Sequence, residues 1–368
     1  MWLFIILSQI LTLTTSTVFL WLILPKRLVS KITIVLAVFI INNVALLYGL
    51  SEFWRERFYV YLVINILQGL MMYAALATAV LVFINRRILK RQSHPIRARV
   101  MAVVVYIGIV GLALFNAYSP IVHELTVTTT KPMDKSMKIA LVSDTHLGRW
   151  FGNRQLDKLV NVVDAQNPDV VVIAGDIMND STFYYDKNNM QEQLSELNAP
   201  LGVYAVLGNH DYSGNQVAIA AAVERAGIKV IDNKNVLLDD SVWLVGRSDI
   251  TDPEPRILAK SLLAQVDTDK PVIFLEHSLE STSALKDLPI DLHLSGHTHG
   301  GQIFPLNILL KRFQPLIHGS EKVDDTQFLV TSGYGFGAVP FRLGTRSEIW
   351  LITLQSSKQS STKSVNDE

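Results

Sequence analysis

Four long segments at the start of the chain contain no charged residue and no histidine, and they constrain the fold more than any other feature. A helix of about 20 residues, rising 1.5 Å per residue, spans a hydrocarbon core about 30 Å thick. One buried helix of a soluble protein can imitate such a segment, but four in succession cannot. The uncharged segments are Met1–Pro25, Ile32–Ser51, Phe58–Asn85 and Val100–Val122. We therefore predict an all-α transmembrane region over residues 1–119, with four spans at about 1–25, 32–51, 58–85 and 100–119.

The first segment could instead be a cleaved signal peptide. It lacks a basic region before the apolar run and a cleavage site of small residues, and further apolar segments follow it directly, so we favour a span. Polar side chains occur within the segments at Asn42, Asn43, Asn65 and Gln68. They could line a polar pathway, but hydrogen bonds between helices are the more common use of such residues. The segments carry no charge, so nothing supports a proton relay or an ion pump.

The charge distribution predicts how the chain lies in the membrane. The net charge is zero, but residues 1–119 hold 11 Lys and Arg with only two acidic residues, whereas residues 120–368 carry the compensating negative charge. Basic residues concentrate in the first and third loops, at 26–31 and 86–99. By the positive-inside rule these loops are cytoplasmic. We therefore predict a multi-pass protein of the cell membrane, with the region after residue 120 on the exoplasmic side.

After the apolar region the sequence changes character. A Thr-rich segment at 120–136 is interpreted as a linker, and the Ser- and Lys-rich end at 356–368 as a disordered tail. Residues 137–355 between them alternate short β-branched runs with helical stretches, which is typical of an α/β domain. The predicted strands are 138–143, 169–174, 202–207, 242–245, 271–275, 290–294, 328–331 and 348–354, and the predicted helices are 154–166, 187–197, 216–226 and 256–266.

Metal-ligating residue types follow several of these predicted strands directly. Functional sites of α/β folds lie at the carboxyl ends of strands, so these residues are expected to converge. Imidazole and carboxylate ligands without thiolate suit Mn, Fe, Zn or similar ions, and the chain has no cysteine. The set is large enough for two ions that share a carboxylate. It comprises Asp144, His146, Asp176, Asn209, His210, Asp211, His277, His297 and His299.

The order and spacing of these blocks resemble the calcineurin-like metallophosphoesterase superfamily, whose pattern is D-x-H, G-D, G-N-H-[DE], H and G-H-x-H. All five blocks occur in order over residues 137–354. The stretches Ser143–His146 and Ser295–Gln302 are similar to the membrane-associated bacterial branch. The resemblance implies a four-layer αββα sandwich for this domain. It does not extend to residues 1–119.

The resemblance also implies a role for each residue. Asp144, His146 and His299 would hold one divalent metal ion, Asn209, His277 and His297 a second, and Asp176 would bridge the two. These seven are the predicted metal ligands. A hydroxide shared by the ions would attack phosphorus, His210 would protonate the leaving group, and Asp211 would orient the His210 ring.

The predicted function is therefore a membrane-anchored, dinuclear metal-dependent phosphoesterase. Its partners would be the lipid bilayer and a phosphate monoester, diester or pyrophosphate, which tethering suggests is lipid-linked or derived from the envelope. No nucleic-acid partner is expected, because membrane spans interrupt the basic cluster. The alternative is a non-catalytic metal-binding membrane sensor or scaffold. Outside the motif, His293 is interpreted as structural, and Arg342 and Arg346 as solvated surface in preference to substrate contacts.

Overall fold

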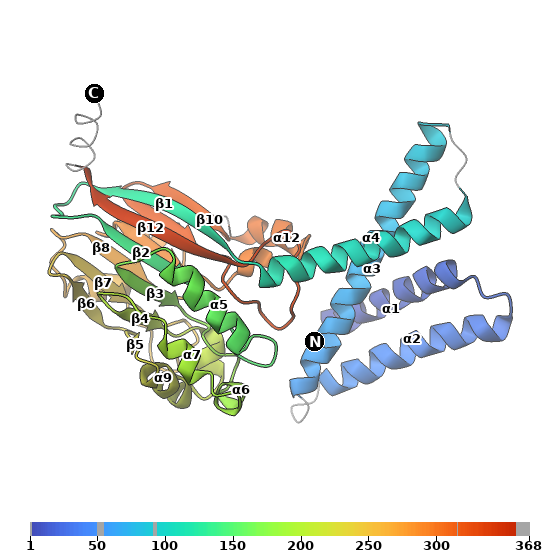
Figure 1. The fold of residues 1–368 in the computed structure, drawn as a ribbon, viewed down its shortest axis with the longest axis horizontal. Helices are drawn as coiled ribbons and strands as arrows, with labels where there is room; N and C mark the ends of the chain where they lie inside the picture. The colour runs from blue at the N-terminus through green and yellow to red at the C-terminus, as the bar shows by residue number, and fades with distance from the viewer. Residues whose placement is uncertain (1, 50–54, 91–93, 315, 358–368) are drawn as a thin grey trace. The chain divides into compact units, whose positions relative to one another are not determined.

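The computed structural model describes residues 2–49, 55–90, 94–314 and 316–357, and the chain forms two compact units (Figure 1). A helical unit comprises residues 1–115 with 338–341, and an α/β unit comprises 116–337 with 342–368. The predicted tail lies almost entirely outside the described residues. Each unit is described by itself below.

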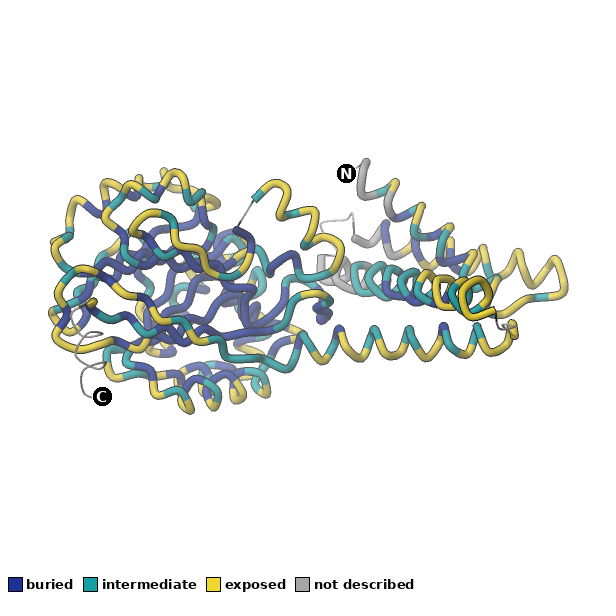
Figure 2. The backbone as a smooth tube through the Cα atoms, turned by 90° about the horizontal axis from the view of Figure 1, so that it is seen from above, coloured by how far each residue is buried: buried dark blue, intermediate teal, exposed yellow. Residues whose placement is uncertain are grey.

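The helical unit contains the apolar segments. Its helices are α1 (Trp2–Ile23), α2 (Leu28–Gly49), α3 (Arg55–Arg87) and α4 (Pro95–Tyr118). Within the described residues, two stretches are long and apolar enough to cross a membrane, Leu62–Arg87 and Pro95–Tyr118, whereas α1 and α2 supply the shorter apolar stretches Ser8–Ile23 and Leu28–Val44. Among the described residues, most of the exposed large hydrophobic side chains lie on these four helices. Figure 2 shows how much of the helical unit is exposed. The four-span arrangement remains a prediction.

Polar side chains join three of the helices. Asn42 on α2 is fully buried, donates to Thr12 Oγ1 on α1 at 2.6 Å, and accepts from Gln68 Nε2 on α3 at 2.6 Å. Gln9 of α1 donates to Asn43 Oδ1 at 3.0 Å. These contacts confirm the interpretation that Asn42, Asn43 and Gln68 form hydrogen bonds between helices.

Two six-stranded sheets form the centre of the α/β unit. The order of the first is β1-β12-β2-β3-β4-β5, and that of the second is β10-β11-β9-β8-β7-β6. The first sheet consists of β1 (Ile121–Thr129), β12 (Glu348–Ser356), β2 (Met137–Val142), β3 (Val170–Ala174), β4 (Val203–Val206) and β5 (Lys229–Val230). The second consists of β10 (Gly319–Val323), β11 (Thr326–Val330), β9 (Leu292–Ser295), β8 (Val272–Leu275), β7 (Val242–Gly246) and β6 (Asn235–Leu238).

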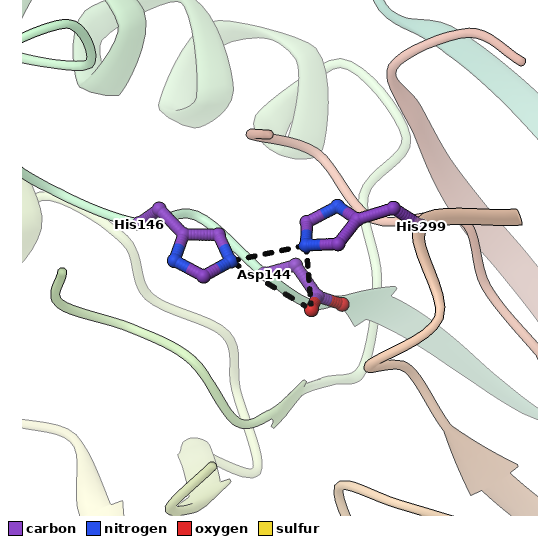
Figure 3. Close-up of side chains that lie close together, drawn as sticks. All are labelled: Asp144, His146 and His299. Atoms are coloured by element: carbon purple, nitrogen blue, oxygen red, sulfur yellow. Dashed lines mark hydrogen bonds and ion pairs between the residues drawn. The ribbon is translucent and has the colours of Figure 1, made fainter. Parts of the chain in front are cut away.

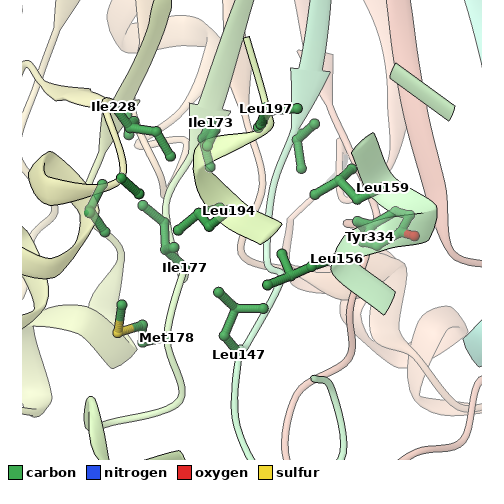
Figure 4. Packing of buried hydrophobic residues seen from close by; sticks show 14 of the residues in the cluster. Leu147, Leu156, Leu159, Ile173, Ile177, Met178, Leu194, Leu197, Ile228 and Tyr334 are labelled. Atoms are coloured by element: carbon green, nitrogen blue, oxygen red, sulfur yellow. The ribbon is translucent and has the colours of Figure 1, made fainter. Parts of the chain in front are cut away.

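Both faces of the central strands are buried, which explains their near-continuous apolar sequences. Along β3, Val170 and Val172 enter the core between the two sheets, whereas Val171 and Ile173 enter the core beneath the helices. The helices over the first sheet include α5 (Asn153–Asp164), α7 (Gln191–Ser195) and α9 (Gln216–Arg225). Figure 4 shows Leu156 of α5 and Leu194 of α7 in this core with Ile173 of β3. Residues of α10 (Ala259–Leu263) and α11 (Thr282–Leu285) share a third core with the second sheet. These layers confirm the predicted αββα sandwich.

The linker interpretation of residues 120–136 is wrong for most of that segment. Residues 121–129 form β1, which pairs in parallel with β12 from Ile121↔Glu348 to Thr129↔Ser356. The Thr and Val residues there are β-branched and fit a pleated strand better than a flexible connection. All eight predicted strands are present, whereas β1, β5, β6 and β10 were not predicted.

The helix predictions were less complete. The predicted helix at 187–197 is interrupted: α6 (Phe183–Lys187) ends where it was expected to begin, and α7 covers only its centre. Two further helices without a prediction bear on function: α8 (Asn209–Ser213) and α12 (Leu306–Phe313).

Candidate metal centre

The loops at the carboxyl ends of five strands bring all nine predicted site residues to one edge of the sandwich. The first sheet supplies Asp144 and His146 after β2, Asp176 after β3, and Asn209, His210 and Asp211 after β4. The second sheet supplies His277 after β8, and His297 and His299 after β9. Neither sheet alone holds a complete set, so the site depends on how the two sheets pack.

The first group of ligand atoms contains Asp144, His146 and His299 (Figure 3). His146 Nε2 lies 3.1 Å from His299 Nε2 and 4.0 Å from Asp144 Oδ1, and His299 Nε2 lies 3.5 Å from Asp144 Oδ1. Ligands bound at about 2.1 Å to one cation are separated by about 3.0–3.4 Å in octahedral or tetrahedral geometry. The 3.1 Å and 3.5 Å separations are in or close to this range, whereas the 4.0 Å separation of His146 Nε2 and Asp144 Oδ1 is wider than between adjacent bound ligands. The three atoms thus lie close enough together to converge on one ion.

The second group contains Asn209, His277 and His297. Asn209 Oδ1 lies 3.0 Å from His277 Nε2 and 2.8 Å from His297 Nδ1, and the two ring nitrogens are 3.2 Å apart. His277 Nδ1 lies 2.8 Å from the carbonyl oxygen of Ala174. Donation to that carbonyl fixes the tautomer in which Nε2 presents a lone pair, as metal-binding histidines require.

Asp176 lies between the two groups. Its Oδ2 is 3.5 Å from His146 Nε2 and 3.3 Å from His277 Nε2, whereas its Oδ1 accepts from the His210 backbone N–H at 2.8 Å. One carboxylate oxygen of Asp176 therefore faces both groups, and the other is held by the loop after β4.

The electrostatics of the site favour cations. Asp144 Oδ1 is buried without a hydrogen-bond partner among the described residues. Burial lowers the pKa of His146 to about 3, so its imidazole is neutral and able to bind a metal. Burial also acts to lower the pKa of His277, but the nearby carboxylates, Asp176 foremost, raise it to about 10. A buried imidazole is protonated so readily where the negative charge around it is uncompensated, and a bound cation would supply that compensation.

Backbone strain is concentrated at the predicted ligands. Among the seven, five have φ in the left-handed region, which non-glycine residues rarely adopt. Strain of this kind persists where the surrounding structure fixes it, and it clusters at functional sites. The values are 54° for Asp144, 45° for His146, 50° for Asp176, 74° for His297 and 49° for His299.

The glycines that precede ligands serve different purposes. Gly175 has φ +78°, as expected for a sharp turn after a strand. Gly208 has φ −103°, and the structure requires space there instead, because a Cβ would lie 2.2 Å from Asp176 Oδ1. At Gly296 a Cβ would lie 2.0 Å from Ser143 Oγ and 2.5 Å from Asp144 Oδ2. Close approach of neighbouring loops thus explains two of the three glycines: loops of the same sheet meet at Gly208, and loops of the two sheets meet at Gly296.

The predicted role of Asp211 is wrong. Asp211 is buried and its carboxylate accepts three backbone N–H groups, from Gly208, Ile177 and Met178 at 2.9–3.1 Å. The Asp211 carboxylate therefore links the loop after β3 to the loop after β4 through hydrogen bonds. Burial and the charge of Asp176 raise its pKa to about 7.

Asp180 is the residue that holds the His210 ring, with its Oδ1 2.8 Å from His210 Nδ1. Burial lowers the pKa of His210, but the hydrogen bond to Asp180 and nearby carboxylates produce a net rise. The sequence analysis missed Asp180. The available signal was an acidic residue four positions after Asp176 in the same loop.

The interpretation of Arg342 as solvated surface is also wrong. Its guanidinium is completely buried and donates to the carbonyl oxygens of Ser332 and Gly335, each at 2.6 Å. Arg342 Nη2 also lies 3.2 Å from His299 Nδ1. Arg342 thus fixes the Gly-rich loop beside the site. Arg346 donates to the Ser119 carbonyl oxygen at 2.7 Å and is half-buried.

His293 is structural, as predicted. It is fully buried, and its Nε2 lies 3.0 Å from Glu276 Oε1. Glu276 also accepts from Arg247 and Arg256, so these side chains form a polar network within the second sheet's loops.

Comparison with known proteins finds matches to proteins described as phosphoesterases or metallophosphoesterases. A family model described as calcineurin-like phosphoesterase matches residues 137–301. An uncharacterized metallophosphoesterase of Campylobacter jejuni is 32% identical over 272 residues, which cover 70% of this chain and 72% of that protein. A Bos taurus transmembrane protein with metallophosphoesterase domain is 34% identical over 280 residues, which cover 70% of this chain and 62% of that protein.

An uncharacterized metallophosphoesterase of Aquifex aeolicus is 30% identical over 256 residues, covering 66% of this chain and 97% of that protein. Among solved structures, the protein TT1561 of Thermus thermophilus matches with a TM-score of 0.37 at 16% identity, covering 53% of this chain and 89% of that chain.

Proposed function

The chain belongs to the calcineurin-like metallophosphoesterase family, and from this premise we propose that it is a dinuclear metal-dependent hydrolase of phosphoesters. The observation that carries the proposal is the position of Asp176 Oδ2, within 3.5 Å of a ligand nitrogen in each of two separate groups. A single-ion site would not need both groups.

The residues divide naturally between two ions. Asp144, His146 and His299 would hold the first, and Asn209, His277 and His297 the second, with Asp176 common to both. When bound, two divalent cations supply an activated water for attack on phosphorus and neutralise charge on the phosphoryl oxygens. Mn, Fe and Zn all suit this set of oxygen and nitrogen ligands.

His210 is the proposed general acid. Its ring packs edge-on against the His146 ring, with centroids 4.8 Å apart, which places it beside the first group. Asp180 fixes the ring through Nδ1, so Nε2 is left to give a proton to the departing alkoxide. A positioned acid of this kind contributes about 10²–10⁴ to the rate.

Membrane attachment is the second part of the proposal. We propose four spans, with the first and third loops in the cytoplasm and the α/β unit on the exoplasmic side. The concentration of basic residues in those two loops supports this orientation. The bovine relative's description as a transmembrane protein is consistent with anchoring. The proposed substrate is a phosphate monoester, diester or pyrophosphate, lipid-linked or derived from the envelope.

Hydrolysis tests the catalytic part. The full chain, purified in detergent without chelator and supplied with Mn²⁺, should cleave nitrophenyl phosphate or its bis-nitrophenyl diester, and an Asp176→Asn variant should not. If two ions bind and neither ester nor a lipid phosphate is cleaved, the alternative of a non-catalytic metal-binding sensor or scaffold replaces this proposal.

Labelling tests the orientation. The chain has no cysteine, so Lys322→Cys introduces a single thiol at an exposed position of β10. An impermeant maleimide should label it in intact cells. Labelling only after the membrane is permeabilised would place the α/β unit in the cytoplasm.

A further inference from the structure

Helix α12 presents most of its apolar stripe outward. Leu306, Leu309, Leu310 and Phe313 recur at the i, i+3, i+4, i+7 spacing that normally faces a core. Here no residue of α12 is buried, and Leu306, Leu309 and Phe313 are 47%, 55% and 77% exposed. With Phe304 and Ile308, five of the large hydrophobic residues exposed on the α/β unit fall within residues 304–313.

The half-buried residues of α12 are Asn307 and Leu310. Asn307 is half-buried, and its backbone lies so close to Gly301 that a Cβ at that glycine would be 2.4 Å from Asn307 Cα. Its Nδ2 would be 3.0 Å from a Cβ at Gly344. The helix thus packs on the domain through Asn307 and partly through Leu310. Leu306, Leu309 and Phe313 are exposed, unlike the apolar residues of a helix that contributes to a core.

The last turn of α12 is basic. Lys311 and Arg312 are both exposed, and neither forms an ion pair within the described part of the chain. Apolar residues combined with exposed cations are typical of helices that lie in the interface of a bilayer containing anionic lipids.

Two hydrogen bonds join residues 342–343 to the segment before α12 and to Asn116 in the last turn of α4. The Phe304 backbone N–H donates to the Leu343 carbonyl oxygen at 2.7 Å. One residue before Leu343, the Arg342 carbonyl oxygen accepts from Asn116 Nδ2 at 3.3 Å. Asn116–Tyr118, the last residues of α4, belong to the α/β unit. Residues 342–343 therefore contact both the segment before α12 and the last turn of α4, where the apolar helix ends.

Aromatic residues mark the same junction. The Tyr118 hydroxyl donates to the Trp150 carbonyl oxygen at 3.2 Å, and the Trp150 side chain is 38% exposed. Tyr and Trp are enriched where proteins meet the headgroup region of a membrane.

We propose that α12 inserts its apolar stripe, together with Phe304, into the interface of a bilayer that contains anionic lipid. This places the membrane surface beside the metal centre, because α12 begins seven residues after His299. Hydrogen bonds of Gln302 hold the segment between His299 and α12 in place. The Gln302 side chain accepts from the Gly337 N–H at 3.0 Å and donates to the Gly337 carbonyl oxygen at 3.1 Å. The Gln302 carbonyl oxygen accepts from the Leu343 N–H at 2.9 Å.

The proposal also narrows the substrate class. A site held at the bilayer surface would take a phosphoester carried by a membrane lipid's headgroup in preference to one free in solution. This second step rests on the proposed function, whereas insertion of α12 does not.

Fluorescence depth measurement tests the insertion. The full chain carrying Leu309→Cys or Phe313→Cys is labelled with the environment-sensitive dye NBD and reconstituted in phosphatidylcholine–phosphatidylglycerol vesicles. Both sites should give a blue-shifted emission that lipids spin-labelled near the headgroup quench about twofold or more, and the exposed control Lys322→Cys should give neither. Absence of quenching at both α12 sites overturns the proposal. A blue shift that vanishes when the protein is diluted in lipid also overturns it, since the stripe then contacts a second copy.

A substrate comparison tests the second step. With Mn²⁺, the Leu309→Ser/Phe313→Ser variant should lose activity on vesicle-borne dioleoyl phosphatidate and keep activity on soluble nitrophenyl phosphate. Equal activity on both substrates relative to the unmodified chain, or an equal loss on both, refutes a lipid-surface substrate. If the unmodified chain hydrolyses neither ester, the proposed function fails, and the fluorescence result still decides insertion.

Discussion

Gly208→Ala tests whether the close approach of the loops positions Asp176. The backbone at Gly208, with φ −103°, accepts any residue, so the substitution acts through space alone. A Cβ there would lie 2.2 Å from Asp176 Oδ1 and 2.3 Å from its backbone nitrogen. Because one of these neighbours is backbone, side-chain rotation cannot relieve the overlap, and the loops must separate by about 1 Å to restore ordinary contact.

This displacement is expected to lower both the stability of the protein and its catalytic rate. Overpacking of this size destabilises a protein by about 1–3 kcal/mol. A 1 Å misplacement at an active site costs about 10² in rate. We therefore expect Gly208→Ala to remain folded, to bind fewer than two metal ions per chain and to lose about 10² in kcat/KM. The assay combines metal analysis of the purified full chain, nitrophenyl ester hydrolysis and thermal unfolding in the same detergent.

Gly227→Ala is the matched control. Gly227 follows α9 with φ +86° and has no heavy atom within 4 Å of a built Cβ, so alanine there introduces backbone strain of about 1–2 kcal/mol without a clash. It should lower the unfolding temperature and leave metal content and turnover unchanged. Wild-type metal content and turnover in Gly208→Ala would refute the reasoning, and so would an equal loss of metal in Gly227→Ala.

Three further outcomes are expected. Asp180→Asn should lower kcat about 10-fold or more at unchanged metal content, because the His210 ring loses its charged partner; an unchanged kcat would leave Asp180 without a positioning role. Arg342→Met should destabilise the full chain by about 2–6 kcal/mol, since the buried carbonyl oxygens of Ser332 and Gly335 lose their donor at about 1–3 kcal/mol each, and a shift of under 1 kcal/mol in thermal unfolding would contradict this. Glu348 is buried, which raises its pKa, but hydrogen bonds from histidines, His123 first, produce a net lowering. Its contribution to stability is therefore present above the unfolded-state pKa of about 4.5 and is lost as the pH falls through the lower folded-state value. In pH-dependent unfolding, Glu348→Gln should flatten that acid-side loss, and an unaltered slope would exclude the contribution.

The candidate ligands of the first sheet could be predicted from sequence because they follow strands closely. Asp144, Asp176 and Asn209 come after strands that pair in parallel, so their positions at one edge follow from the alternation of strands and helices. The histidines of the second sheet could be assigned only through the family's motif. No local sequence pattern predicts that the two sheets pack with these loops in contact.

The missed features depend on tertiary structure. Asp180 lies in the loop after β3, and nothing in its immediate sequence indicates that a histidine 30 positions later would contact it. Arginine is usually found at the surface, and only the folded Gly-rich loop supplies the carbonyl oxygens that accept hydrogen bonds from the buried Arg342 guanidinium. Residues 121–129 looked like a linker because their strand partner, β12, lies more than 200 positions away. The apolar stripe of α12 is visible in the sequence, but its outward direction is not.

Metal stoichiometry combined with turnover tests the central claim most directly. The full chain and a His210→Gln variant would be purified without chelator, loaded with Mn²⁺, analysed for bound metal and assayed on the bis-nitrophenyl diester and the nitrophenyl monoester. The account predicts two ions per chain in both proteins, hydrolysis by the unmodified chain, and a loss of about 10²-fold or more in the variant. One ion or none per chain, or equal turnover by the two proteins, would contradict it.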